Sequence, residues 1–102
     1  MTDKEIERNA MYVTGGDEES ARGAVILLGR LWSIAKRRAR IWERANNSRA
    51  YAESAAHERE WGRIESERED CEWELRFFYC AEVTWPGLYP VVVCHDGRHI
   101  YF

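Results

Sequence analysis

The sequence lacks any apolar stretch long enough to cross a bilayer. Its longest uncharged apolar run, Gly23 to Gly29, falls far short of the roughly 20 residues that a spanning helix needs. The amino-terminal MTDKEIERN is charged where a secretory signal would have an apolar segment. The three cysteines are odd in number and follow no framework spacing, which favours reduced thiols. We therefore expect a cytoplasmic protein with no membrane partner.

The sequence also lacks a recognisable catalytic, phosphate-binding or metal-binding motif. Neither a P-loop Lys-Ser/Thr pair nor a GxGxxG pattern follows Gly15-Gly16, so these glycines are interpreted as a break between helices. The candidate metal ligands Cys80, Cys94 and His99 have no short C-x2-C or H-x3-H spacing. A reactive Cys94–His99 pair would need an orienting group that the sequence does not offer. We expect no cofactor and no metal, with a small metal-binding or Cys/His-dependent enzyme as the third alternative.

What the sequence does contain is typical of one globular domain spanning residues 1–102. It has 45% hydrophobic and 32% charged residues, which is too apolar for a disordered chain. Helical patterns cover residues 3–12, 18–45 and 48–72, and the Asn46-Asn47-Ser48 cluster favours a break between the two long ones. A single helix of more than fifty residues is the alternative.

The segment 18–45 carries the strongest helical pattern and should be the central packing element. Its apolar side chains occupy one broad face, which comprises Ala24, Leu27, Leu28, Leu31, Ile34, Ala35, Ala39, Trp42 and Ala45. Arg38 projects into this face and needs an acidic partner or an open edge for its guanidinium.

The segment 48–72 has a narrower apolar seam with a spacing of four and three residues. The seam comprises Ala50, Ser54, His57, Trp61, Ile64, Arg68, Cys71 and Leu75. Such a helix packs by one stripe, and a homodimer could use the part of this seam around Trp61 and Ile64.

Residues 75–102 show the alternating period of β-strands. Leu75, Phe77 and Tyr79 begin a run in which every second residue is apolar, and Asp96-Gly97 is a hairpin signal. A two-residue loop there would place Cys94 opposite His99. The fold class is therefore α+β: a short N-terminal helix, an antiparallel hairpin of two long helices and a C-terminal three-stranded antiparallel meander packed on them.

Charge is segregated along the chain although the net charge is only −3. Residues 21–50 contain eight basic and one acidic side chains, whereas residues 51–82 contain four basic and ten acidic ones. The two long helices could complement each other when packed antiparallel. Alternatively, the basic face of residues 30–44 could hold an acidic partner or nucleic acid.

Five tryptophans and five tyrosines are more than a core of this size requires, and such residues often anchor protein interfaces. The sequence therefore predicts a non-catalytic module that binds a larger protein, with nucleic-acid binding as the second alternative. In size and general character it is similar to the small stoichiometric inhibitors of phages and mobile elements, anti-CRISPR proteins among them. The predicted partner-binding residues are Arg37, Arg40, Arg44, Trp61, Trp73 and Tyr89.

Overall fold

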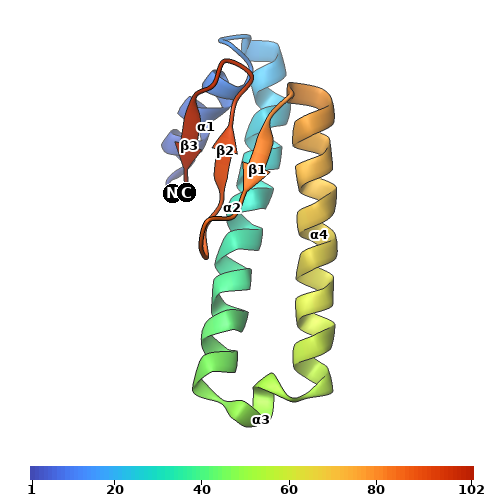
Figure 1. Ribbon diagram of the computed structural model, residues 1–102. Coiled ribbons are helices and arrows are strands. Elements are labelled where there is room, and N and C mark those ends of the chain that lie inside the picture. Colours follow the sequence, from blue (N-terminus) through green and yellow to red (C-terminus); the bar gives the residue numbers. More distant parts are fainter.

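Two long antiparallel helices form the frame of the protein, and a short helix and a small sheet pack against one half of it (Figure 1). The structure is a computed structural model that describes residues 1–102. The elements are α1 (Asp3–Val13), α2 (Glu18–Asn47), α3 (Arg49–Ala52), α4 (Ala55–Tyr79), β1 (Glu82–Thr84), β2 (Val91–Val93) and β3 (His99–Tyr101). The α+β class and the helical hairpin are confirmed. No helix combines the length and apolar character that a membrane crossing demands.

Polar side chains fix where the helices begin. Asp17 caps α2 by accepting a hydrogen bond from the Glu19 amide at 3.3 Å, and Ser54 caps α4 by accepting one from the His57 amide at 3.2 Å. The predicted break between the long helices is confirmed, because α2 ends at Asn47. The structure adds the single turn α3 between the two long helices.

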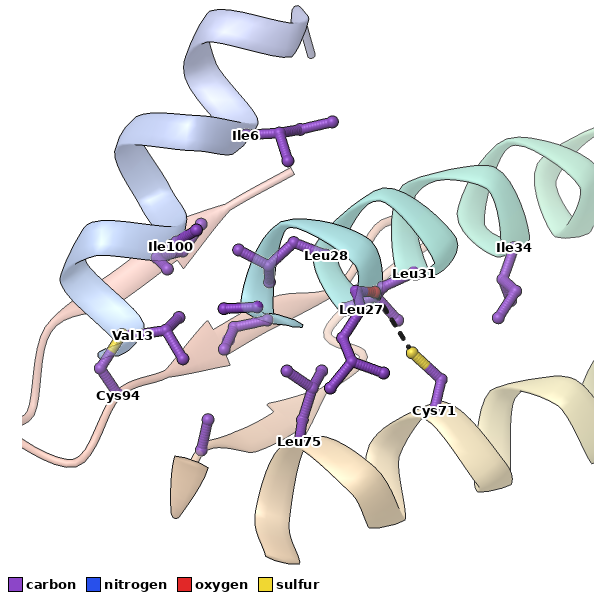
Figure 2. Packing of buried hydrophobic residues seen from close by; sticks show 14 of the residues in the cluster. Ile6, Val13, Leu27, Leu28, Leu31, Ile34, Cys71, Leu75, Cys94 and Ile100 are labelled. Atoms are coloured by element: carbon purple, nitrogen blue, oxygen red, sulfur yellow. Dashed lines mark hydrogen bonds between the residues drawn. The ribbon is translucent and has the colours of Figure 1, made fainter. Parts of the chain in front are cut away.

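The core lies where α2 meets α1, α4 and the sheet (Figure 2). Leu28, Leu31, Leu75 and Val92 have no exposed surface. Cys71 belongs to the same core, and its thiol donates a hydrogen bond to the Leu27 carbonyl at 3.4 Å. We call residues 1–35 and 71–102 the proximal half and residues 36–70 the distal half. Every side chain with 0% exposure lies in the proximal half.

The predicted strand at residues 75–79 is wrong, because α4 continues to Tyr79. Leu75 lies one turn beyond Cys71 and extends the buried helical stripe, so the helical period prevails over the alternating one. The helix ends at Cys80, whose φ of 51° is left-handed, and the Ala81 amide then donates to the Leu75 carbonyl.

The predicted register of the last hairpin is also wrong by one residue. Val92 pairs with Ile100 and Val93 pairs with His99, so the loop holds three residues, of which Gly97 has a φ of 89°. A one-residue shift turns side chains to the other face. Cys94 is buried on the same face as Val92, whereas His99 is exposed on the opposite face and does not pair with it.

The buried face of α2 rotates along its length. Leu31 and Ile34 face the core as predicted, but farther on it is Ile41 that is buried, and Trp42 is 48% exposed. In a straight helix, residues seven apart do not point in the same direction but differ by about 20°. Over the thirty residues of α2 the side that contacts α4 therefore turns around the helix. The seam of α4 is confirmed at Ile64, Cys71 and Leu75, which face α2. A homodimer through Ile64 is therefore wrong, because α2 already covers it.

Candidate functional site

Three aromatic side chains near the end of α4 form a cluster of exposed apolar side chains. Trp73, Phe77 and Phe78 are 60%, 65% and 61% exposed. The rings of Trp73 and Phe77 stack at 4.8 Å with 7° between their planes, and Phe78 meets Phe77 edge to face at 5.0 Å. These contacts hold the rings together without burying them. We call these three residues the aromatic surface.

The helical period explains why the rings of Trp73 and Phe77 face outward. Cys71 and Leu75 are buried against α2, and Trp73 and Phe77 each follow them by two residues, or about 200° around the helix. Ile26 on α2 is also exposed, at 63%. The Arg30–Glu74 ion pair at 2.8 Å shows that these two residues lie side by side on the antiparallel helices, and one turn farther along lie Ile26 and Phe78.

Of the six predicted partner-binding residues, only Trp73 lies on this surface. Arg37 forms an ion pair with Glu67 at 2.9 Å, and the Arg44 guanidinium lies 4.0 Å from the centre of the Tyr51 ring.

The other three predicted residues lie apart as well. Arg40 is exposed on α2, and Trp61 is only partly exposed. Tyr89 is 41% exposed and packs against Trp32 at 5.8 Å. The structure therefore does not bring the six residues together.

Sequence reasoning missed Phe77 and Phe78 because both were assigned to a strand. The four-residue spacing of Trp73 and Phe77 was the available signal, since residues four apart are neighbours on a helix.

Charge complementarity between the two long helices is confirmed. Arg30, Arg37 and Arg38 on α2 each form an ion pair with a glutamate on α4. The first two pairs are substantially exposed and add little free energy. They nevertheless neutralise much of the basic stretch that a nucleic acid would have to contact.

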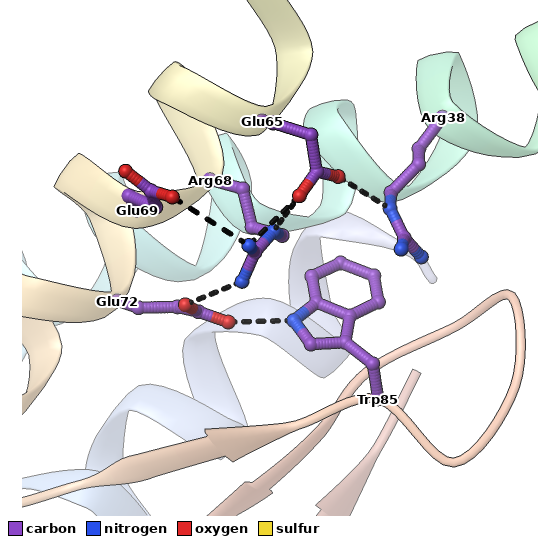
Figure 3. A network of polar contacts seen from close by, with 6 residues as sticks. All are labelled: Arg38, Glu65, Arg68, Glu69, Glu72 and Trp85. Atoms are coloured by element: carbon purple, nitrogen blue, oxygen red, sulfur yellow. Dashed lines mark hydrogen bonds and ion pairs between the residues drawn. The ribbon is translucent and has the colours of Figure 1, made fainter. Parts of the chain in front are cut away.

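Arg38 belongs to a polar network that has Arg68 at its centre and lies between α2, α4 and Trp85, the residue after β1 (Figure 3). Its Nε donates to Glu65 at 3.1 Å, which is the acidic partner that the sequence required, and its guanidinium lies 4.6 Å from the Trp85 ring centre and 5.1 Å from that of Trp61. Arg68 bridges Glu65 and Glu72.

The same network joins the sheet to α4 and sets the charge of Glu65. The Trp85 indole donates a hydrogen bond to Glu72 at 2.6 Å. Burial acts to raise the pKa of Glu65, but hydrogen bonds from Arg68 and Arg38 outweigh it and hold that pKa below its ordinary value. The network therefore links α2, α4 and the sheet through an ionised carboxylate.

The candidate metal ligands lie apart. Cys94 is buried beneath the sheet, where burial raises the pKa of its thiol, and His99 is exposed on the other face. Cys80 lies in a cleft of about 330 Å³ that His95 and Asp96 also line. No three His, Cys, Asp or Glu side chains are placed to hold a metal ion together.

Comparison with known proteins finds no matching family model, no similar curated protein and no similar solved structure. The geometry of the surface is therefore the basis for assigning a function.

Proposed function

We propose that the protein is a non-catalytic interaction module that docks on a larger protein through the aromatic surface. The observation that carries the proposal is the stacked, exposed triad of Trp73, Phe77 and Phe78. Large exposed apolar areas on a folded chain mark interaction sites, and rigid aromatic side chains lose little conformational entropy when they bind. The rings already hold one another in place, which reduces the cost of ordering them in a complex.

Nucleic-acid binding through residues 30–44 has less support, because three arginines of this stretch have ion-pair partners on α4. The remaining basic side chains, Lys36, Arg40 and Arg44, offer too few phosphate contacts for stable binding in physiological salt. We expect no measurable shift of a random 20-base-pair duplex in a gel assay. A submicromolar shift that is lost when Arg40 and Arg44 become alanine would favour the nucleic-acid alternative.

In size and general character the chain is similar to small stoichiometric inhibitors such as anti-CRISPR proteins. Inhibition of the docked protein in the cytoplasm is the form of the function that we would test first. Such an inhibitor needs no catalytic group, since occupying a surface on the target is sufficient.

The test is photo-cross-linking in the cell that makes the protein. Benzoylphenylalanine replaces Arg76, which is exposed and lies three residues beyond Trp73 on α4. We expect an adduct much heavier than two copies of the 12.0 kDa chain. It should disappear with Trp73→Ala and persist with Trp42→Ala, a matched control because Trp42 is also exposed but lies in the distal half. Equal adduct yields from the two variants would reject the proposal.

A further inference from the structure

The aromatic surface continues into an exposed stripe that runs along the outer side of α4, away from α2. All of its members are exposed and recur every three or four residues, namely Arg59, Gly62, Ser66, Asp70, Trp73 and Phe77. The stripe spans about 27 Å at 1.5 Å per residue. A stripe of this length can pack along a helix of similar length from another molecule.

The chemistry of the stripe differs between its two ends. The amino-terminal end has small side chains, Gly62 and Ser66, beside Arg59 and Arg63, whereas the carboxyl-terminal end has the stacked rings of Trp73 and Phe77. A second copy laid antiparallel places rings over small residues and guanidinium groups at both ends of the contact. A parallel copy would place rings against rings and arginine against arginine. The two ends of the stripe are therefore complementary to each other in the antiparallel direction, whereas the Asp70 carboxylates near its middle lie close to one another and weaken the contact.

The glycine of the stripe supports contact with a second copy. A Cβ at Gly62 would meet nothing within 4 Å, so no contact inside the chain requires glycine there. Glycine inside a helix costs about 1 kcal/mol relative to alanine, yet it allows another helix to approach closely.

The arginines of this chain also lie over aromatic rings repeatedly. Arg38 lies over Trp61 and Trp85, Arg44 over Tyr51 and Arg98 over Tyr12. An intermolecular contact between Arg63 and Trp73 would repeat this arrangement across two copies.

We propose that, in the free protein, a second copy covers this stripe in an antiparallel, two-fold symmetric dimer, and that docking on the larger protein displaces it. The proposal rests on the proposed function, because it names what occupies the same aromatic surface before docking. One helix stripe on each copy buries less area than a standard interface, so the dimer is weak. We expect a dissociation constant on the order of 10–100 µM, which a tighter partner can overcome.

Sedimentation velocity of the purified full chain tests whether the dimer forms. Between about 5 and 500 µM, a range that brackets this dissociation constant, the weight-average mass should rise from 12.0 kDa toward twice that value. Phe77→Glu should keep the mass at the monomer value. The control Tyr101→Glu changes a side chain that is 72% exposed on the sheet, and its mass should rise as that of the wild type does. Circular dichroism checks that Phe77→Glu folds, and Trp73→Ala serves as the second variant.

Disulfide cross-linking tests the antiparallel direction in a chain whose exposed cysteine is removed by Cys80→Gly. Asp70 lies two residues from the middle of the stripe, so an Asp70→Cys variant brings its thiols within about 6 Å of each other along the axis. Arg59 lies nine residues from the middle, which separates its two copies by about 27 Å. We expect rapid cross-linking for Asp70→Cys and none for Arg59→Cys. Equal cross-linking of both would overturn the antiparallel dimer.

The two proposals fail in different ways. A mass that stays at 12.0 kDa up to about 500 µM overturns the dimer but leaves the heavy photo-adduct, and therefore the docking function, intact. Conversely, a concentration-dependent dimer with a photo-adduct of only two chains would overturn docking on a larger protein, and with it the displacement step.

Discussion

The proximal and distal halves of the helical hairpin are stabilised by different forces. In the proximal half, α1, α4 and the sheet pack around α2 and enclose side chains with no exposed surface, among them Leu28, Leu75 and Val92. The distal half has only two helices and the turn α3, and its best buried side chains are Ile41, Tyr51 and Ile64. Apolar burial dominates the first, whereas ion pairs and rings under guanidinium groups contribute a larger share in the second. One pair of helices can thus be stable at one end and adaptable at the other.

Removing one buried side chain from each half should give the largest difference in stability between the two halves. Leu28→Ala should lower the free energy of unfolding by about 3 to 5 kcal/mol, because the surrounding layers cannot collapse into the cavity. Ile41→Ala should cost about 2 kcal/mol, since Ile41 lies at the edge of a two-helix contact. Urea unfolding measures both. Equal losses would show that the distal half is as tightly packed as the proximal half.

The two exposed tryptophans should separate the halves in binding. Trp73→Ala should weaken docking on the larger protein by about 2 kcal/mol or more, because Trp73 lies within a stacked aromatic cluster. Trp42→Ala should change it by less than about 0.5 kcal/mol, because Trp42 is outside that cluster. Titration calorimetry with the purified partner gives both values. A larger loss for Trp42→Ala would move the docking surface to the distal half.

The charge network should make the distal half sensitive to acid. Because hydrogen bonds hold the pKa of Glu65 below its ordinary 4.5, its ionised form stabilises the fold above that pH, and this contribution is lost as pH falls through the lower, folded value. Glu65→Gln should cost about 1.5 kcal/mol at neutral pH. The difference from the wild type should shrink in acid.

Unfolding curves of wild type and variant between neutral and acidic pH measure this effect. Glu58→Gln is the control, because Glu58 is an exposed carboxylate on the same helix. A pH-independent difference between the wild type and Glu65→Gln would argue against an ionic role for Glu65.

The exposed Arg49–Glu53 pair should have the smallest effect. Its side chains are 91% and 67% exposed, so Arg49→Ala should change the free energy of unfolding by no more than about 0.5 kcal/mol. Thermal unfolding in low and high salt detects the change. A loss above 1 kcal/mol would mean that α3 contributes more to stability than its exposed contacts indicate.

The sequence predicted α1 and α2 well because long periodic patterns and capping residues act locally, but the second long helix, predicted over residues 48–72, runs from Ala55 to Tyr79. Asp17 and the Asn46–Ser48 break were both informative, and each lies at a boundary of α2. The end of α4 could not be predicted in the same way. Leu75, Phe77 and Tyr79 satisfy the alternating period, whereas the spacing of Trp73 and Phe77 also fits a helix, and the contact with α2 decides in favour of the helix.

The hairpin register and the candidate surface depended on similar tertiary details. Asp96-Gly97 suits both a two-residue and a three-residue loop, and the choice decides whether Ile100 or its neighbours His99 and Tyr101 lie on the buried face with Val92 and Cys94. Trp73 was identified by residue type alone. Phe77 and Phe78 became visible as its neighbours only once α4 was seen to extend through them.

The three thiols lie in different parts of the fold, so their rates of chemical labelling can measure local opening of each part. Cys71 lies between α2 and α4, and burial raises the pKa of its thiol to about 11, while Cys94 lies beneath the sheet and Cys80 is exposed. An alkylating reagent should modify Cys80 at once, and the other two only as often as their surroundings open. The ratio of the two slow labelling rates would therefore reveal whether the sheet can detach while the helices remain together.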